Sequence, residues 1–345
     1  MTQTADTNEF QATTSDTIDA EVLGRLREGY ADLKAQIHKV IVGQDEVIDA
    51  VLCCMLANGH CMVQGVPGLA KTLLVHSVSE ALAMTFNRIQ FTPDLMPSDI
   101  TGTDIIQEDT ETSQRRYEFI RGPVFANVIL ADEINRTPPK TQAALLQSMQ
   151  EREVTVSGRT YKLDQPFFVL ATQNPIEQEG TYPLPEAALD RFMFMVYMDY
   201  PAPHEEHEIV KQTTIGRRHA LQPVLSAEDM LAFQDVVRSA PVSDVVIQYC
   251  VELARATRPG DPLATEMVRK YLKWGAGPRA GQFMTLGAKA RALIKNRITP
   301  SFDDVKAIAR PVLRHRIIPN FNAEADGVTV DQIIDDLIAH ARPPK

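Results

Sequence analysis

The sequence predicts an α/β fold in which a domain built on a five-stranded parallel sheet is followed by an all-α domain. Up to Tyr200, short continuous apolar segments alternate with helical patterns, as is typical of a parallel sheet buried on both faces. The segment Pro201–Pro203 then interrupts the chain, and only helical patterns follow it. The length of 345 residues is also sufficient for two domains.

The first domain begins with helices. Residues 1–16 are rich in Thr, Asp, Gln and Ser, and we expect a mobile tail there. The sheet domain is expected over residues 17–202. Apolar residues from Ile18 to Ile37 recur at helical spacing, which predicts a helix with one apolar stripe. A second helix is predicted over residues 44–57.

The predicted strands are short and almost entirely apolar. Two further segments, about 103–120 and 153–167, place polar turns between β-forming residues, so we expect two hairpins that project from the sheet domain. The five sheet strands are expected at Cys61–Val63, Arg88–Phe91, Val128–Ala131, Phe167–Ala171 and Met193–Met198.

The second domain is expected to cover residues 203–345 and to contain helices only. Two of its helices have a recognisable start, because Ser226 and Ser301 each stand three residues before an aspartate, Asp229 and Asp304. This spacing resembles the capping box of a helix, with Asp in place of the usual Glu or Gln.

Composition excludes several classes of function. The formal charge of -10 disfavours nucleic acid as a ligand. The four cysteines form no C-x-x-C pair, so neither a zinc site nor a disulfide framework is indicated. No lysine or arginine precedes Arg25, and no apolar run approaches the ~20 residues of a membrane helix. We therefore expect a cytoplasmic protein without a membrane span.

The segment Gly65–Thr72 follows the first predicted strand and opens a helix that runs to about Met84. A tight loop at a helix start presents backbone N–H groups and the positive end of the helix dipole to an anion. Lys71 can reach the outer phosphates of a nucleotide, and Thr72 can ligate Mg²⁺. The predicted phosphate-binding loop consists of Gly65, Val66, Pro67, Gly68, Leu69, Ala70, Lys71 and Thr72.

Position 70 departs from the usual G-x-x-x-x-G-K-[ST] pattern, because Ala70 stands where a second glycine is expected. Only a positive φ would demand glycine at this position. We therefore expect Ala70 to have a helical φ and the substitution to cost little.

A second candidate element is the apolar strand that ends in Asp132 and Glu133. Ligands of open α/β sheets bind at the carboxyl ends of the strands, and adjacent side chains there point in different directions. Asp132 can therefore hold Mg²⁺ through water, while Glu133 polarises an attacking water. The sequence predicts two carboxylates with two roles.

Three more polar residues follow. Asn174 ends the fourth predicted strand and can orient a water molecule by hydrogen bonding. Arg191 follows a short helix just before the fifth strand, where it can lie too far from its own phosphates and yet reach those of a neighbouring subunit. Arg279 starts a helix of the second domain, from which its guanidinium could fold back onto the nucleotide.

The order of these motifs resembles that of AAA+ ATPases. Three longer segments, residues 91–102, 132–142 and 173–186, are similar to those of the MoxR family in particular, and the resemblance covers nearly everything after the tail. The motifs that carry it are Val42-Gly43-Gln44, Gly65–Thr72, Asp132-Glu133, Asn174, Asp190-Arg191 and Arg279.

The resemblance implies a role for each motif. It implies ATP and Mg²⁺ as the bound groups, and many members have Ala at the position of Ala70. The Walker A motif falls on Gly65–Thr72, Walker B on Asp132 and Glu133, sensor 1 on Asn174, the arginine finger on Arg191, sensor 2 on Arg279, and the adenine near Val42, Gly43 and Gln44.

The resemblance further implies a P-loop AAA+ domain followed by a lid domain, with hairpins that correspond to the helix-2 insert and the pre-sensor-1 insert. Members assemble as hexameric rings and are thought to act as chaperones that remodel or activate other proteins, often with a partner that carries a von Willebrand factor A domain. We therefore expect a magnesium-dependent ATP hydrolase that acts in a homo-oligomeric ring on a client protein. The sequence does not identify that client.

Two alternatives remain open at this stage. A DNA-dependent AAA+ motor would need basic pore hairpins, and the acidic residues around Arg115-Arg116 oppose this role. A salt-sensitive, DNA-stimulated ATPase activity would support it. A nucleotide-dependent scaffold would bind ATP without releasing phosphate, and the presence of both Glu133 and Arg191 argues against it.

Overall fold

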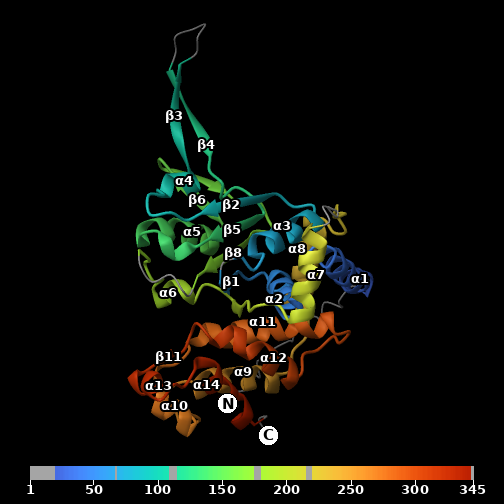
Figure 1. Cartoon of the computed structure of the whole chain (residues 1–345), viewed down its shortest axis with the longest axis vertical. Coiled ribbons are helices and arrows are strands. Elements are labelled where there is room, and N and C mark those ends of the chain that lie inside the picture. The colour runs from blue at the N-terminus through green and yellow to red at the C-terminus, as the bar shows by residue number, and fades with distance from the viewer. Residues whose placement is uncertain (1–19, 67, 109–114, 175–179, 215–219, 343–345) are drawn as a thin grey trace, which may run out of the picture.

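The computed structural model describes residues 20–66, 68–108, 115–174, 180–214 and 220–342; the predicted tail at residues 1–16 lies outside them. Its central sheet has five strands in the order β2-β5-β8-β1-β9, with every neighbouring pair parallel. The predicted five-stranded parallel sheet is confirmed (Figure 1). Its strands are β1 (Cys61–Gln64), β2 (Phe86–Gln90), β5 (Val128–Asp132), β8 (Phe168–Gln173) and β9 (Phe194–Tyr197).

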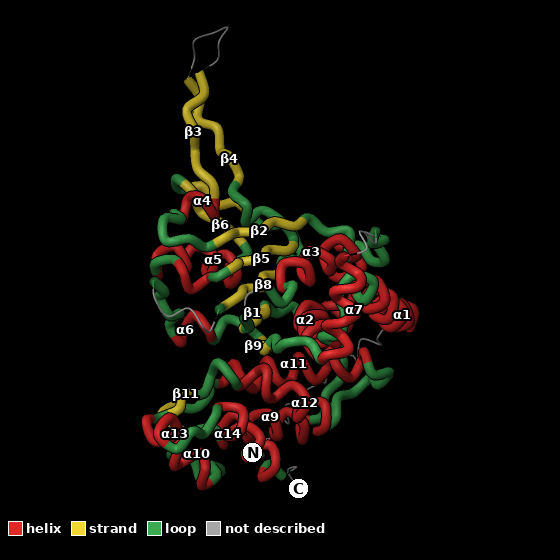
Figure 2. The backbone as a smooth tube through the Cα atoms, in the orientation of Figure 1, coloured by secondary structure: helices red, strands yellow, loops and turns green. Residues whose placement is uncertain are grey.

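Both faces of this sheet are buried, and β5 shows it most directly. Val128 and Leu130 belong to one apolar cluster, whereas Ile129 and Ala131 belong to another. Successive side chains of a strand point to opposite faces, so helices must cover the two sides separately. Figure 2 shows these strands between the helices on either side.

One face is covered mainly by helices from the amino-terminal part of the chain, and the other mainly by α5. The apolar stripe of α1 includes Leu26 and Leu33, both of which are buried. The opposite face receives Leu145 and Met149 of α5. The helices of this part are α1 (Ala20–Ile37), α2 (Asp45–Leu56), α3 (Lys71–Ala81), α4 (Pro97–Thr101), the 3₁₀ turn η1 (Ile134–Arg136), α5 (Pro139–Glu151) and α6 (Glu186–Leu189).

Two antiparallel hairpins occupy the segments in which hairpins were expected. They are β3 (Gly102–Glu108) with β4 (Arg115–Arg121), and β6 (Glu153–Val156) with β7 (Arg159–Lys162). The first hairpin projects far from the sheet domain (Figure 1). At its base Phe119 stacks on Tyr161 of the second hairpin, with ring centroids 4.2 Å apart. The two hairpins therefore support each other.

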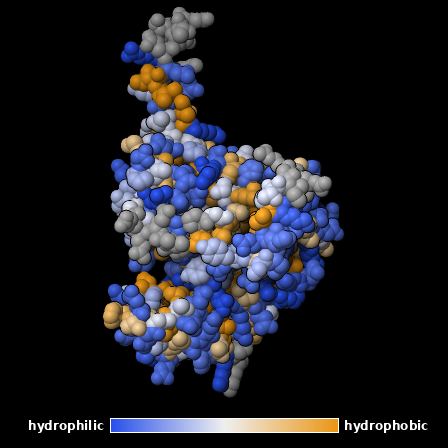
Figure 3. All heavy atoms as spheres, viewed as in Figure 1, coloured by the Kyte–Doolittle hydropathy of each residue, from blue (hydrophilic) through white to orange (hydrophobic). Residues whose placement is uncertain are grey.

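The projecting hairpin carries apolar side chains that no other described part of the chain covers. Ile106, Tyr117 and Ile120 are 59%, 72% and 50% exposed. Figure 3 shows hydrophobic atoms along this hairpin, away from the body of the molecule. Exposed apolar groups that are grouped in this way are typical of contact surfaces.

The carboxy-terminal part is mainly helical but not entirely so. A short antiparallel ladder joins β10 (Leu272–Trp274) to β11 (Ile318–Pro319), so the expectation of helices only is wrong in this detail. Strands of two or three residues are too short to show a period in the sequence. The helices are α7 (Pro203–Thr214), α8 (Ala227–Ser239), α9 (Asp244–Ala256), α10 (Glu266–Tyr271), α11 (Pro278–Ile294), α12 (Phe302–Leu313), α13 (Phe321–Ala325) and α14 (Val330–His340).

These helices pack directly on the sheet domain. One apolar cluster continues from α1, α2 and β9 into α8, α9, α11 and α12. Gly287 of α11 shows how close the approach is, because a Cβ there would lie 3.1 Å from Phe194 of β9. Figure 2 shows α11 and α12 beneath β9, and α8 packs against both α1 and α2. The division of the chain at residue 203 stays a prediction.

The starts of α8 and α12 confirm the predicted capping boxes. The Ser226 hydroxyl accepts from the Asp229 amide, and the Ser226 amide donates to the Asp229 carboxylate. At α12 the Ser301 amide donates to Asp304 at 2.8 Å. No described helix is long and apolar enough to cross a membrane.

Asp304 also joins two helices. Its carboxylate is fully buried and is ion-paired with Arg291 of α11 and with Arg297. Burial raises the pKa of this carboxyl, but the hydrogen bonds from Arg297 and Ser301 outweigh it and hold the pKa at about 2. Because the folded pKa lies below the unfolded value, the charged group stabilises the fold above about pH 4, and this contribution is lost as the pH falls toward 2.

We predict that Asp304→Asn lowers the free energy of unfolding by about 3 kcal/mol at neutral pH, since two arginines lose their buried counter-charge. Urea unfolding of both proteins between pH 2 and 7 tests this, and the difference should shrink below about pH 4. Asp303→Asn is the matched control, because Asp303 is exposed in the same helical turn and should change stability by less than about 1 kcal/mol. Equal losses in both variants would contradict this account of Asp304.

Candidate active site

The predicted loop, the two carboxylates and Asn174 gather at the carboxyl edge of three neighbouring strands. β1 pairs with β8, and β8 pairs with β5. The loop Gly65–Thr72 follows β1, Asp132 ends β5, and Asn174 directly follows β8. A hydrogen bond of 3.3 Å from the Gly65 amide to the Gln173 carbonyl fixes the start of the loop to β8. The register of the sheet therefore brings these motifs together.

Two glycines of the loop have different reasons to be glycine. A Cβ on Gly65 would lie 2.6 Å from the Met198 carbonyl oxygen, so a side chain does not fit there. Gly68 has open space around it but a φ of +88°, which side-chain-bearing residues rarely adopt. Pro67 lies outside the described residues.

Ala70 does not have the helical φ that we expected. It has φ 60° and ψ 24°, in the left-handed region, as the residue before α3. The expectation is wrong because the loop must reverse direction immediately before the helix, whichever residue stands there. An alanine in this conformation costs about 1 kcal/mol, which explains why the usual pattern has glycine.

Lys71 and Thr72 form the first turn of α3. The Lys71 ammonium donates to the Gly65 carbonyl at 2.5 Å, so its side chain joins the end of the loop to its start. Burial lowers the pKa of Lys71, and the nearby Asp132 and Glu133 carboxylates act in the opposite direction. The cation and the two carboxylates thus belong to one electrostatic unit.

Asp132 is buried and held on both oxygens. Thr172 donates to Oδ1 at 2.5 Å, and Arg88 of β2 donates to Oδ2 from Nη2 at 2.5 Å and from Nε at 3.2 Å. These bonds fix the direction of the carboxylate, because three donors from two neighbouring strands converge on it. Arg88 is a feature that no sequence motif singled out.

Glu133 has φ 57° and ψ 48°, again in the left-handed region. Its amide donates to the Thr172 hydroxyl at 2.9 Å, while Oε2 accepts from Gln90 at 2.8 Å and from Arg136 at 3.0 Å. Its carboxylate therefore has partners different from those of the Asp132 carboxylate, and the shared neighbour Thr172 meets Glu133 at its amide. Strained backbone of this kind is found mostly where a function depends on it.

A cavity of about 220 Å³ lies beside the loop. Gln44 borders this region, because its side chain donates to the Asp199 carbonyl at 3.0 Å. Gly43 has φ +67° and lies against Glu205 of α7. Together with Val42 these residues were predicted to lie near the adenine, and of the three Gln44 is hydrogen-bonded to a residue that lines the cavity. The lining residues are Gln64, Gly65, Val66, Tyr197, Met198, Asp199 and Tyr200.

The donor set suits Mg²⁺ held by a nucleotide rather than by protein alone. No cluster of three His, Cys, Asp or Glu side chains exists among the described residues. Mg²⁺ commonly takes one or two protein oxygens and completes its octahedron with water and phosphate oxygens. Thr72 could supply such an oxygen, and Asp132 could hold the ion through water, since both its oxygens already accept hydrogen bonds.

The remaining predicted site residues lie at two different places. Asn174 is buried, with 5% of its surface exposed, at the same edge as Asp132. Arg191 precedes β9 and therefore lies toward the amino edge of the sheet, where its Nε donates to Gln150 at 2.9 Å. Arg279 donates to Asp190 at 2.8 Å, and this is the partner of its guanidinium in the described part of the chain.

Sequence reasoning missed the residues that orient the predicted ones. Arg88 and Gln90 are two residues apart on β2, so their side chains lie on the same face of the sheet. In the parallel register Gln90 lies opposite Asp132. That register was the only signal that could have found them, and it depends on knowing that β2 neighbours β5. Asp190 enters the sequence analysis only as part of the Asp190-Arg191 motif, and no motif includes Arg316.

The class of protein follows from comparison of this fold and site with known families. Residues 60–194 match the model of the ATPase family associated with various cellular activities (AAA). Residues 264–337 match the model of the AAA lid domain. The first match contains β1, the phosphate-binding loop, Asp132, Asn174 and Arg191, and the second contains α11 with Arg279.

Individual relatives narrow the class. Chaperone MoxR1 of Mycobacterium tuberculosis is 41% identical over 310 residues, which cover 90% of this chain and 81% of that protein. Protein MoxR of Methylorubrum extorquens is 28% identical over 82% of this chain and 85% of that protein. The crystal structure of a candidate ATPase from Cytophaga hutchinsonii aligns with a TM-score of 0.86 and 40% identity, over 94% of this chain and 98% of that one. The chain belongs to the MoxR family of AAA+ ATPases.

The left-handed backbone at position 70 leads to a prediction. Ala70→Gly should bind nucleotide about as well as the parent protein, since glycine adopts this conformation freely. Ala70→Val should bind about tenfold more weakly, because a branched residue adds roughly 1–2 kcal/mol of backbone strain. Titration with a fluorescent ATP analogue measures both. Ala70 is exposed, so a larger side chain there does not disturb the packing. Equal affinities of the two variants would contradict the proposed backbone strain.

Proposed function

We propose that this chain hydrolyses ATP in a homo-oligomeric ring, at sites shared between neighbouring subunits, and uses the hydrolysis to remodel or activate other proteins. The family membership and the chaperone name of the Mycobacterium relative support this proposal. We further propose a hexamer and a partner with a von Willebrand factor A domain, as the resemblance to the MoxR family implies. The division into a nucleotide-binding domain at 17–202 and a lid at 203–345 is part of this proposal.

One observation supports a site shared between subunits: the phosphate-binding loop and Arg191 lie at opposite edges of one sheet. β1 and β9 run parallel, with Cys61 opposite Phe194 and Gln64 opposite Tyr197. The phosphate-binding loop follows β1, whereas Arg191 precedes β9, so the length of the strands, about 13 Å for four residues, separates them. Arg191 is therefore better placed to serve the nucleotide of an adjacent subunit than its own.

The side chains of one subunit would then perform most of the reaction. Mg²⁺-bound ATP supplies the phosphoryl group to be transferred, with Thr72 and Asp132 as the residues that would hold the metal. Lys71 neutralises negative charge on the outer phosphates. Glu133 accepts the proton of the attacking water, and Asn174 orients that water.

The neighbouring subunit completes the site with its Arg191. A guanidinium that arrives from outside stabilises negative charge as it develops during transfer. Hydrolysis by a single subunit is then slow, and assembly accelerates it. The exposed apolar side chains of the β3–β4 hairpin, Ile106 and Tyr117 among them, are candidates for contact with the client protein.

The role of Glu133 as general base is tested by Glu133→Gln. We expect the variant to bind ATP and assemble as the parent does, because the amide has the same shape. Hydrolysis should fall by about 10²- to 10⁴-fold, the usual contribution of a general base. Phosphate release and nucleotide binding, measured on the same preparation, check this, and parental turnover would refute the assignment.

The shared site is tested by mixing two inactive variants. Arg191→Ala alone should reduce turnover by about 10³- to 10⁵-fold. Mixed with Lys71→Ala, it should regain activity, because an intact Lys71 site can then meet an intact Arg191 from its neighbour. Differently tagged subunits that copurify show that mixed oligomers form. If mixed oligomers form and no activity returns, the site is not shared.

A further inference from the structure

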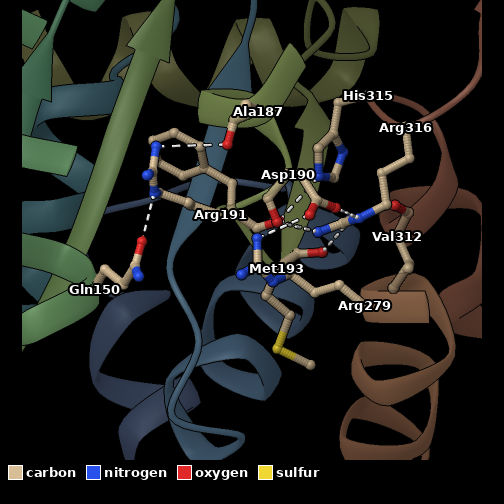
Figure 4. Close-up of polar contacts among 10 residues, drawn as sticks. Gln150, Ala187, Asp190, Arg191, Met193, Arg279, Val312, His315 and Arg316 are labelled. Carbon is tan, nitrogen blue, oxygen red and sulfur yellow. Dashed lines mark hydrogen bonds and ion pairs between the residues drawn. The ribbon is translucent and has the colours of Figure 1, made fainter. Parts of the chain in front are cut away.

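The turn between α6 and β9 carries Arg191 and lies against the lid. Figure 4 shows that the side chains of Asp190 and Arg191 point in opposite directions from this turn. The Arg191 guanidinium reaches toward Gln150 of α5, while the Asp190 carboxylate lies between Arg279 and Arg316. One turn therefore presents an arginine outward and a carboxylate to the lid.

Arg316, just after α12, makes five hydrogen bonds, most of them to this turn. Its side chain is only 1% exposed. Nε donates to Asp190 Oδ1 at 2.9 Å. Nη2 donates to the carbonyls of Asp190 and Phe192 at 2.9 and 2.6 Å, and Nη1 donates to those of Met193 and Val312 at 3.2 and 2.5 Å. Four of these five bonds go to residues 190–193.

Two further lid residues bind the same turn. Arg279 of α11 donates to Asp190 Oδ2 at 2.8 Å, so the two carboxylate oxygens are held by different parts of the lid. His315 donates from Nε2 to the Phe192 carbonyl at 2.9 Å. The lid thus satisfies the backbone carbonyls of Asp190, Phe192 and Met193 and both carboxylate oxygens of Asp190.

These contacts are too costly to break one at a time. Burial lowers the pKa of Arg316 to about 10, and the Asp190 carboxylate acts in the opposite direction. The arginine remains charged at neutral pH, and an unpaired charge at a buried position is strongly unfavourable. The turn and the carboxyl end of α12 are therefore expected to move as one body.

Arg191 itself is held far less firmly. Its guanidinium contacts the exposed Gln150 at 2.9 Å and the Ala187 carbonyl at 3.5 Å. Both acceptors are uncharged and exposed, so water can replace them at little cost in free energy. The Arg191 side chain can therefore leave them for a negatively charged partner. Its backbone, by contrast, lies within the segment that Arg316 binds.

We propose that Asp190 and Arg316 are positioning residues that fix Arg191 to the lid of its own subunit. Movement of that lid then advances or withdraws Arg191 at the nucleotide of the adjacent subunit. This inference rests on the proposed shared site and adds a route by which one subunit controls hydrolysis in the next. The Asp190 carboxylate does not touch the nucleotide in this account.

Mixed oligomers test this route. Asp190→Asn removes the charge without changing the shape. Alone, it should lower kcat by about 10- to 100-fold, as displacement of a reacting group by about 1 Å does, with KM for ATP within about twofold of the parent. Mixed with Lys71→Ala, it should recover as much activity as the Arg191→Ala and Lys71→Ala mixture does. The ATP site of the Asp190→Asn subunit is intact, and it receives a correctly held Arg191 from the neighbouring Lys71→Ala subunit.

The controls separate the possible failures. Glu133→Gln mixed with Lys71→Ala should recover nothing, because both variants are defective in their own ATP site. If the Arg191→Ala mixture recovers activity and the Asp190→Asn mixture does not, Asp190 serves its own subunit and the inference is wrong. If the Arg191→Ala mixture also fails, the shared site is wrong and the inference fails with it.

Asp190→Asn leaves Arg316 without a counter-charge and could prevent folding. Asp190→Glu is the second variant, because it keeps the ion pair and lengthens the side chain by one methylene group. It should fold, lose less activity than Asp190→Asn, and show the same unchanged KM and the same recovery with Lys71→Ala. Full parental activity of Asp190→Glu together with no recovery by Asp190→Asn would overturn the proposal.

Discussion

The parallel register of β5, β8 and β1 is the constraint on which the rest of this structure depends. Because these strands are neighbours and end at one edge, the loop after β1, the carboxylates after β5 and the amide after β8 must converge. The same register sends the start of β9 to the opposite edge, together with Arg191. A single sheet thus separates Arg191, the proposed arginine finger, from the predicted phosphate-binding loop.

The lid contacts this arrangement at the amino edge of β9. Three cationic or hydrogen-bonding side chains of the lid, Arg279, His315 and Arg316, converge on the turn at Asp190. The lid also shares one apolar cluster with α1, α2 and β9. An ion pair in which the arginine is buried transmits displacement better than an exposed pair, because removing the partner of a buried charge is costly. The contacts therefore favour communication between subunits through the lid.

The sequence was sufficient for the sheet and for the three motifs that meet at its carboxyl edge, because apolar strands and loop motifs are local patterns. It was insufficient where the outcome depends on neighbours in space. The left-handed φ of Ala70, the ladder between β10 and β11, and the contacts of Arg88 and Gln90 with the two carboxylates all depend on tertiary structure. Arg316 illustrates this best, since a charged residue near a helix end is usually solvated, yet here it is buried.

The most direct measurement is the structure of the assembled protein with Mg²⁺ and an ATP analogue that cannot be hydrolysed. The account predicts the triphosphate on Gly65–Thr72, with Arg191 of the adjacent subunit beside its terminal phosphate. A triphosphate bound elsewhere in the chain, or one on this loop with no residue of another subunit near it, would contradict the account.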